Sequence, residues 1–439
     1  MAGNAAPDAK SAYRRITQQE AELIVARHEM LLAGRMGGAR AVLGFCDLTG
    51  LNLSGRNLRD ADFAGAVLAD ADLSRAQLDS ANFFATDLRR CNLQSAVLRR
   101  ADLRGASLRG ANLTGADLYE ADLREGVIAR RTQTGDLKYL QHDPKPSEMP
   151  AAILAHANLE RARMTGAVAL QADFSDAIMR SCRLARANLR QANLSGAILE
   201  NADLTGSDLT GANLSGAVLT GAKLAHIRSD GANMTGVLTD APAGVAPDAL
   251  AEPVTDMLRR HALWVQSQGA DGKPVSLANV DLRSVAGLAA YDLTALLAPG
   301  ATLYGLNMDG ARLQGAQLAG ADLRHASFRD ADLRGINLKQ AKLGGACLSG
   351  ANLGPLMIAA DRLMPAQLSG ATLRTADFRN ADLSHALMVQ ADMSYADLGG
   401  ANLRRANLSH ALMTGTTVSS SALGEAIFDG AAGLRLVGR

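Results

Sequence analysis

The chain has 439 residues, a formal net charge of +1, 20% charged residues and 3% aromatic residues. These values exclude a strongly basic or strongly acidic chain, and they suit a narrow core of leucine and alanine better than one built from large rings. Because no apolar signal segment precedes Ser11 and no run of 18 apolar residues occurs, we expect a cytoplasmic protein without a membrane span.

The first predicted elements are a disordered tail over residues 1–16 and a helix over residues 18–33. Thr17 and Glu20 form a capping box at the start of the helix, and Gly34 favours its end. One face carries apolar side chains and a histidine at helical spacing: Ile24, Val25, His28, Leu31 and Leu32. We expect this face to pack on the end of the segment that follows.

Over residues 41–125 a leucine or phenylalanine falls at every fifth position, and a small residue precedes it by two positions. A period of five fits neither the helix period of about 3.6 nor the strand period of about 2. One such unit cannot bury its leucine alone, so units must form coils that stack, with Phe83 above Phe63 and Leu103 above Phe83. The residue between each inward pair is mostly Asp or Asn, which faces outward and can bond backbone groups at turns.

The period then breaks twice. Residues 127–150 are polar and contain three prolines, which predicts a projecting loop. A second block with the same period covers residues 152–234, shifted in phase by one residue. Residues 241–253 are rich in proline and alanine and are predicted to be a linker, so the first capped solenoid spans residues 17–240.

A second helix is predicted over residues 255–268. Its apolar face has the same spacing as that of the first helix: Met257, Leu258, His261, Trp264 and Val265. His261 matches His28, and Trp264 matches Leu31. Because both helices lead through a glycine-containing turn into an Asp-Leu pair, we interpret the chain as an internal duplication.

The second half of the duplication spans residues 254–439. Within it, residues 285–298 lack the period of five and are predicted to be an insert with a short helix. The period then runs over residues 301–428 almost without a break. Pro355 and Pro365 follow central positions and are expected at corners, where proline is tolerated.

The repeated Ala-(Asp/Asn)-Leu-x-x pattern resembles that of the pentapeptide-repeat family over most of the chain. The resemblance implies an all-β solenoid, a right-handed quadrilateral β-helix. An open end of such a stack exposes strand edges and apolar side chains, so we expect two stacks, each with a helical N-terminal cap. The C-terminal tail is too short for a cap; it either folds over the last coil or leaves an end that forms a homodimer.

Nothing in the sequence points to catalysis. The many Asp residues are required by the repeat, and His325 and His385 share a column but stand three coils apart, too far for one metal ion. Phosphate-binding, zinc-protease and serine-hydrolase motifs are absent from the sequence. We therefore predict no catalytic residue, no metal and no cofactor.

The two inserts are the best candidate partner contacts, because loops on a rigid frame often carry recognition. Tyr139 and Leu140 would be the apolar anchors of the first insert, and Tyr291 that of the second. The alternative is that both inserts are merely tolerated.

Arginines cluster in the first block, and stacking would place Arg109 beside Arg89 on one face. Such a patch could contact a partner or nucleic acid. Nucleic acid is the weaker alternative, because acidic residues interleave with the arginines and stacking aromatics are scarce. A solvated face with ion pairs between coils explains the same pattern.

These observations predict a non-enzymatic scaffold or protein–protein interaction module with an unidentified protein partner. One alternative comes from the resemblance, since some pentapeptide-repeat proteins mimic DNA and modulate type II topoisomerases. That role needs a strongly negative rod, which the near-neutral charge disfavours. An enzyme is the remaining and weakest alternative.

Overall fold

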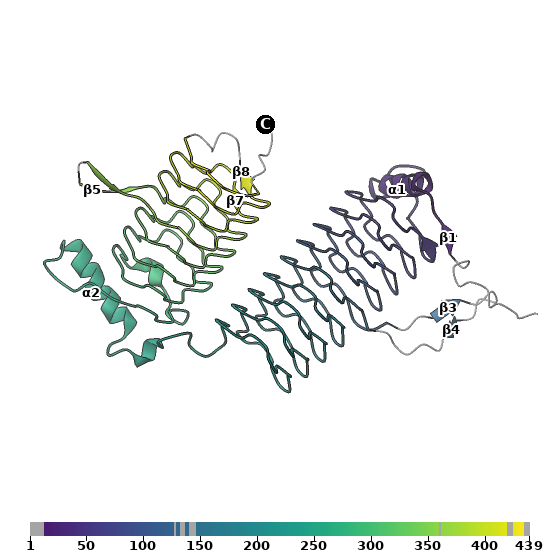
Figure 1. Cartoon of the computed structure of the whole chain (residues 1–439), viewed down its shortest axis with the longest axis horizontal. Coiled ribbons are helices and arrows are strands. Elements are labelled where there is room, and N and C mark those ends of the chain that lie inside the picture. Colours follow the sequence, from purple (N-terminus) through teal and green to yellow (C-terminus); the bar gives the residue numbers. More distant parts are fainter. Residues whose placement is uncertain are drawn as a thin grey trace, which may run out of the picture. The chain divides into compact units, whose positions relative to one another are not determined.

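The computed structural model describes residues 13–126, 129–131, 137–139, 146–359, 361–418 and 425–433. Internal contacts divide the chain into two compact units, residues 1–241 and residues 242–439. Each unit is a stack of coils with a helix at its N-terminal side, α1 (Gln18–Leu32) in the first and α2 (Val254–Gln266) in the second (Figure 1). No helix among the described residues is long and apolar enough to cross a membrane.

Each coil is joined to the next by short parallel bridges, mostly between residues 20 positions apart. The four sides of one coil are marked by the bridges Val42–Asp62, Asp47–Val67, Asn52–Asp72 and Asn57–Gln77. On the first of these sides, Leu43 N–H donates to the carbonyl of Asp62 at 2.7 Å, and Asp62 N–H donates to the carbonyl of Ala41 at 2.9 Å. Only one or two residues of each side are extended, so the stack is held by isolated bridges more than by long strands.

The leucine, phenylalanine and alanine columns form the core of each unit. Phe63 and Phe83, one coil apart, stack with ring centroids 5.0 Å apart and planes 3° from parallel. The corners need a left-handed residue, with a φ of 63° at Gly65 and 57° at Arg75. Arg75 adopts this conformation because its N–H is bonded to the carbonyl of Gln94 in the next coil, at 2.9 Å.

The N-terminal segment covers the open edge of the first coil. Strand β1 (Arg14–Arg15) pairs in parallel with β2 (Cys46–Asp47), so residues 14–16 are not part of a disordered tail. On the next side, the Gln18 side chain behaves like a piece of strand: it donates to the carbonyl of Asn52 at 2.9 Å and accepts the N–H of Asn52 at 3.0 Å. These contacts satisfy backbone groups that would otherwise form an unpaired edge.

Two side chains of α1 cover the remaining sides. Glu29 accepts the N–H of Asn57 at 3.1 Å. His28 accepts the N–H of Ala41 through Nδ1 at 3.1 Å, and its Nε2 lies 2.8 Å from the carbonyl oxygen of Arg59. The helix is thus fixed to the coil through the backbone as well as through apolar contacts.

The buried residues of α1 are Ala21, Val25 and His28. Leu31, predicted to pack in the cap, is 45% exposed and does not belong to this contact. The reason lies in the return of the chain past the helix: an added Cβ at Gly38 would come within 2.3 Å of the backbone nitrogen of Leu31. The chain therefore contacts the helix backbone at this point and not the leucine side chain.

Helix α2 buries the same three positions of its helical pattern, here Val254, Leu258 and His261. The ring of Trp264 stacks on that of His261 with centroids 5.6 Å apart. His261 also bonds two backbone groups of the first coil of its unit. The two helices are therefore equivalent in their buried face and in the use of a histidine.

Residues 241–253 differ from the predicted linker, because from Pro242 on they belong to the second unit. They contain the short helix η2 (Pro247–Ala249). Val245 donates its N–H to the carbonyl of Asn279 and accepts the N–H of Asp281, both at 2.8 Å. This segment therefore covers the edge of the first coil, as β1 does in the first unit.

Residues 285–298 also differ from the predicted insert. They contain the short helix η3 (Leu288–Ala290), but Leu296 is buried in the core. Asp281 pairs with Thr302, which lies 21 positions later instead of 20. A single additional residue thus interrupts the period, and most of this segment belongs to a coil.

Four further strand pairs or pieces complete the element order. In the first insert, β3 (Ala129–Arg131) pairs antiparallel with β4 (Leu137–Tyr139). In the second unit, β5 (Leu356–Ala359) pairs antiparallel with β6 (Arg362–Met364). The last elements, β7 (Asp397–Leu398) and β8 (Thr417–Val418), pair in parallel as part of the stack.

Leu323→Asp should unfold or fray several coils of the second unit, because a carboxylate would replace a fully buried side chain. We expect a loss above about 4 kcal/mol, against less than about 0.5 kcal/mol for Arg329→Ala at an exposed position. Urea and thermal melts would measure both. Equal losses in the two variants would contradict the assignment of inward and outward positions.

Glu29→Gln should weaken the contact between α1 and the first coil only above about pH 4.3. The hydrogen bonds from Arg56, at 2.9 and 2.7 Å, are the main reason that the pKa of Glu29 lies below its usual value, while burial opposes them. This stability is present above the unfolded pKa and is lost as the pH falls through the folded pKa. Hydrogen exchange of the Asn57 amide would check it, and a difference between variant and wild type that persists at about pH 3 would contradict it.

Candidate interaction surfaces

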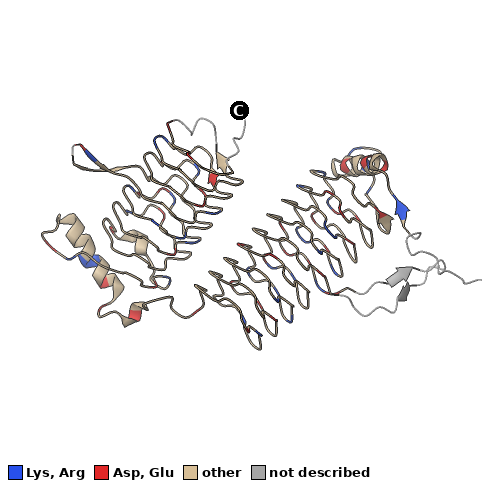
Figure 2. Ribbon diagram, viewed as in Figure 1, with Lys and Arg blue, Asp and Glu red and all other residues tan. Residues whose placement is uncertain are grey.

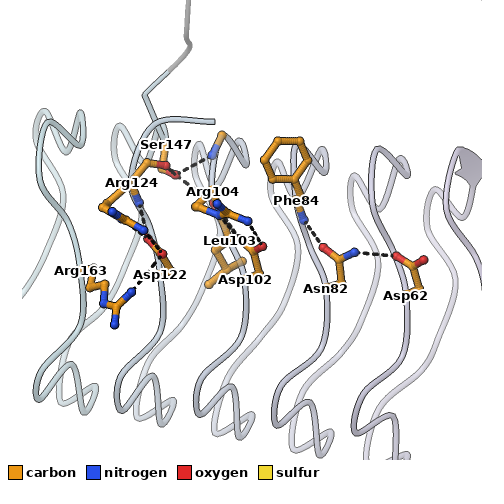
Figure 3. A network of polar contacts seen from close by, with 11 residues as sticks. Asp62, Asn82, Phe84, Asp102, Leu103, Arg104, Asp122, Arg124, Ser147 and Arg163 are labelled. Carbon is orange, nitrogen blue, oxygen red and sulfur yellow. Dashed lines mark hydrogen bonds and ion pairs between the residues drawn. The ribbon is translucent and has the colours of Figure 1, made fainter. Parts of the chain in front are cut away.

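The outward Asp and Asn side chains close the corners of their own coils. Oδ1 of Asn82 accepts the N–H of Phe84 at 3.1 Å, and the Asn82 amide donates to Asp62 of the previous coil at 2.9 Å (Figure 3). Asp102 accepts the N–H of Arg104 in the same way, at 3.2 Å. These side chains therefore serve the backbone and do not form a catalytic pair of carboxylates.

Arginines that follow such an aspartate by two positions fold back onto it. Arg104 contacts Asp102 with Nε at 2.8 Å and Nη2 at 2.6 Å, and Arg124 contacts Asp122 at 2.9 and 2.7 Å (Figure 3). Burial raises the pKa of Asp122, but the hydrogen bonds and the charge of Arg124 outweigh it, so the pKa lies below its usual value. Basic and acidic residues consequently alternate along the coils (Figure 2).

Arg89 and Arg109, the two predicted basic contacts, line one shallow groove of about 380 Å³ at the base of the first insert. Arg89 is bound by Asp87, with Nε at 2.8 Å and Nη2 at 2.5 Å from its oxygens. Arg109 lies 4.0 Å from Glu148. The pair within one coil at Arg89 was not predicted, since the sequence suggested ion pairs between coils.

Ser147 fixes the point where the first insert rejoins the stack. Its hydroxyl donates to the carbonyl of Leu103 at 2.9 Å and accepts the N–H of Gly105 at 3.1 Å (Figure 3). Ser107 pairs with Glu148, 41 positions later. The insert therefore adds 21 residues beyond the usual spacing of 20, which is the physical cause of the phase shift.

The two predicted anchors of this insert are only partly described. Tyr139 ends strand β4, but its side chain lies outside the described part of the structure, as does all of Leu140. Both remain predictions.

Tyr291 lines a second groove, of about 620 Å³, beside helix α2. Arg259 and Leu263 line it from the outer face of the helix, and Arg312 and Asp292 line it from the coils, 3.4 Å apart. Leu263 is 52% exposed, and Tyr291 is partly buried against the core of the second unit. The groove thus combines an apolar lining with balanced charges.

The β5–β6 hairpin was not predicted. Three of its apolar side chains are exposed: Met357 by 68%, Ile358 by 46% and Leu363 by 49%. At its base, Leu356 and Met364 lie over Gly335, where an added Cβ would come within 2.8 Å of both side chains. The hairpin is therefore seated on the coils by its base and presents apolar side chains beyond it.

The sequence hid this hairpin because of its length. Asn337 pairs with Gln367, 30 positions later, so the hairpin adds ten residues, which is twice the repeat and leaves the phase unchanged. The signal that could have revealed it is the absence of the repeat between Pro355 and Pro365, which were instead assigned to corners.

Among the described residues, no group of three or more His, Cys, Asp or Glu side chains could hold a metal ion. The buried thiols are poor nucleophiles, because burial raises the pKa of Cys182 to about 12 and that of Cys91 further.

Coils stacked by parallel bridges, with a leucine core and capped N-terminal edges, define the β-solenoid class of repeat protein. The family model for pentapeptide repeats matches the chain in eight copies, over residues 46–83, 86–124, 151–180, 182–221, 212–237, 316–354, 366–394 and 391–430. The chain therefore belongs to the pentapeptide-repeat family, whose fold is a right-handed β-helix.

Several solved pentapeptide-repeat structures are similar to this chain. HetL, involved in heterocyst differentiation regulation in the cyanobacterium Nostoc sp. strain PCC 7120, is 23% identical over 88% of this chain and 94% of its own, with a TM-score of 0.19. Rfr23 from the cyanobacterium Cyanothece 51142 is 28% identical over 32% and 91%, with a TM-score of 0.24. QnrB1, a plasmid-mediated fluoroquinolone resistance protein, is 18% identical over 46% and 93%, with a TM-score of 0.23. No curated protein matches the chain.

Asp102→Ala should destabilise the first unit more than Arg104→Ala. The aspartate variant loses the acceptor of a backbone N–H, which we expect to reduce the free energy of unfolding by about 1 to 2 kcal/mol. The arginine variant loses an ion pair whose guanidinium side chain is 41% exposed, with an expected loss below about 1 kcal/mol. Urea melts would rank the two variants, and the reverse order would contradict a backbone role for the aspartate.

Proposed function

We propose that this protein is a non-enzymatic scaffold or protein–protein interaction module. The observation that carries the proposal is the β5–β6 hairpin, which presents exposed Met357, Ile358 and Leu363 from a stack of bonded coils. Neighbouring exposed apolar side chains on an otherwise polar surface favour contact with another protein. The grooves beside α2 and beside the first insert are further candidate contacts, because loops on a rigid frame often carry recognition.

The use of ionisable side chains supports this proposal over its alternatives. Outward carboxylates are occupied by backbone N–H groups and arginines, which leaves them unsuited to acid–base catalysis. A DNA-mimicking modulator of a type II topoisomerase would need a continuous negative face. Arginines bound to Asp87, Asp102 and Asp122 argue against such a face on the first unit.

We further propose that the partner is a protein met in the cytoplasm. A homodimer through the C-terminal end remains a prediction, since residues 434–439 lie outside the described part of the chain.

Replacing Met357, Ile358 and Leu363 together by serine should abolish capture of a specific partner without loss of fold, because all three side chains are exposed. Affinity purification with the full chain would measure it, and unchanged thermal melts would show that the coils remain intact. Arg329→Ala, in the same unit, is the control and should retain the partner.

A second variant tests the first insert. Deleting residues 126–146 joins Glu125 to Ser147 and removes 21 residues, which restores the spacing of 20 between bridged positions. Loss of one partner from either variant would support the proposal. Identical partner sets for both variants and the wild type would contradict it.

A further inference from the structure

His261 joins α2 to the first coil of the second unit through both of its ring nitrogens. Nδ1 accepts the N–H of Val275 at 3.2 Å, and Nε2 lies 3.0 Å from the carbonyl oxygen of Thr294. A backbone N–H can only donate and a carbonyl can only accept, so the ring is neutral and carries its proton on Nε2. The histidine is fully buried, and Trp264 stacks on its ring.

The two caps differ in how much they depend on this histidine. Helix α1 is also bound to its coil through the side chains of Gln18 and Glu29. In the described part of the second unit, both hydrogen bonds between α2 and coil residues 275–296 involve His261. The other contacts of α2 with the core are apolar, through Val254 and Leu258.

Protonation of His261 would place a hydrogen on Nδ1, directly opposite the N–H of Val275. The hydrogen bond would be lost, and two donors would face each other across a buried contact. Burial is the main cause that lowers the pKa of His261 below its usual value, against the opposing effects of the Thr294 carbonyl and the Asp292 carboxylate. The folded chain thus favours the neutral ring.

The charged groups around the ring already have partners. On the coil side, Asp292 pairs with Arg312 at 3.4 Å. On the helix side, Arg260 pairs with Glu252. These pairs hold the nearest carboxylate and guanidinium in contacts of their own, so protonation of the ring is not relieved by a new ion pair in this arrangement.

We propose that α2 is an acid-released cap: protonation of His261 detaches the helix from the first coil and frees the edge of that coil. The contribution of the contact is complete above about pH 6.5 and is lost as the pH falls below it, because the unfolded chain binds the proton more readily. The freed backbone groups form an open strand edge, which favours association with another strand. Helix α1 stays attached in this pH range through its additional side-chain contacts.

Hydrogen exchange of the full chain between about pH 7.5 and about pH 5, corrected for the intrinsic pH dependence, tests the proposal. Protection of the Val275 amide should fall about tenfold as the ring protonates, because one buried hydrogen bond is lost. The Ala41 amide, bound to His28, should keep its protection. Exchange of the histidine C2–H in the same samples would report the protonation of His261.

Two matched variants complete the test. His261→Gln retains a donor and an acceptor but cannot titrate, so protection of Val275 should no longer depend on pH. His410→Gln, at an exposed corner, should behave like the wild type. If His261→Gln fails to fold, the coincidence of the Val275 step with protonation of His261 in the unchanged chain still decides the matter.

Either of two results would overturn the proposal. One is full protection of Val275 after His261 has protonated, and the other is the same loss of protection with pH in the His261→Gln variant.

Discussion

Backbone hydrogen bonds between residues 20 positions apart are the constraint on which the rest of this structure depends. They align the leucine and alanine columns, and they force a left-handed residue at each corner whether or not it is glycine. They also leave unpaired groups at the first coil of each unit, which the chain covers with strand pieces, side chains and a helix. The core, the corners and the caps are therefore consequences of one bonding pattern.

The same pattern determines how charge is distributed. Outward Asp and Asn side chains are used to accept corner N–H groups, and arginines two positions later neutralise many of the aspartates. The faces of the coils consequently alternate in charge and offer few uncommitted ionisable groups. Recognition is better placed where the pattern is interrupted, and the β5–β6 hairpin is such a place because its apolar side chains have no coil to pack in.

The two caps show how a duplicated element can keep its contact while changing its dependence on it. His28 and His261 bind equivalent backbone groups, one donor and one acceptor, with similar distances. Around His28, Glu29 and Gln18 add polar contacts, whereas α2 relies on apolar packing around His261. A neutral buried histidine makes either contact sensitive to protonation, but the consequence for the edge differs with the number of other bonds.

The sequence by itself determined the repeat, the inward columns, the structural role of Asp and Asn, and the presence of two helices with a shared histidine, because each leaves a periodic trace in the residue types. It did not determine which helical residues are buried: Leu31 fits the periodic face, yet the path of the chain past Gly38 leaves its side chain exposed. Nor did it determine the length of the interruptions. An insert of 21 residues shifts the phase and is visible, whereas a hairpin of ten residues preserves the phase and is hidden. Only the tertiary structure decided these points, because they depend on where the chain rejoins a bonded neighbour and not on the composition of the segment itself.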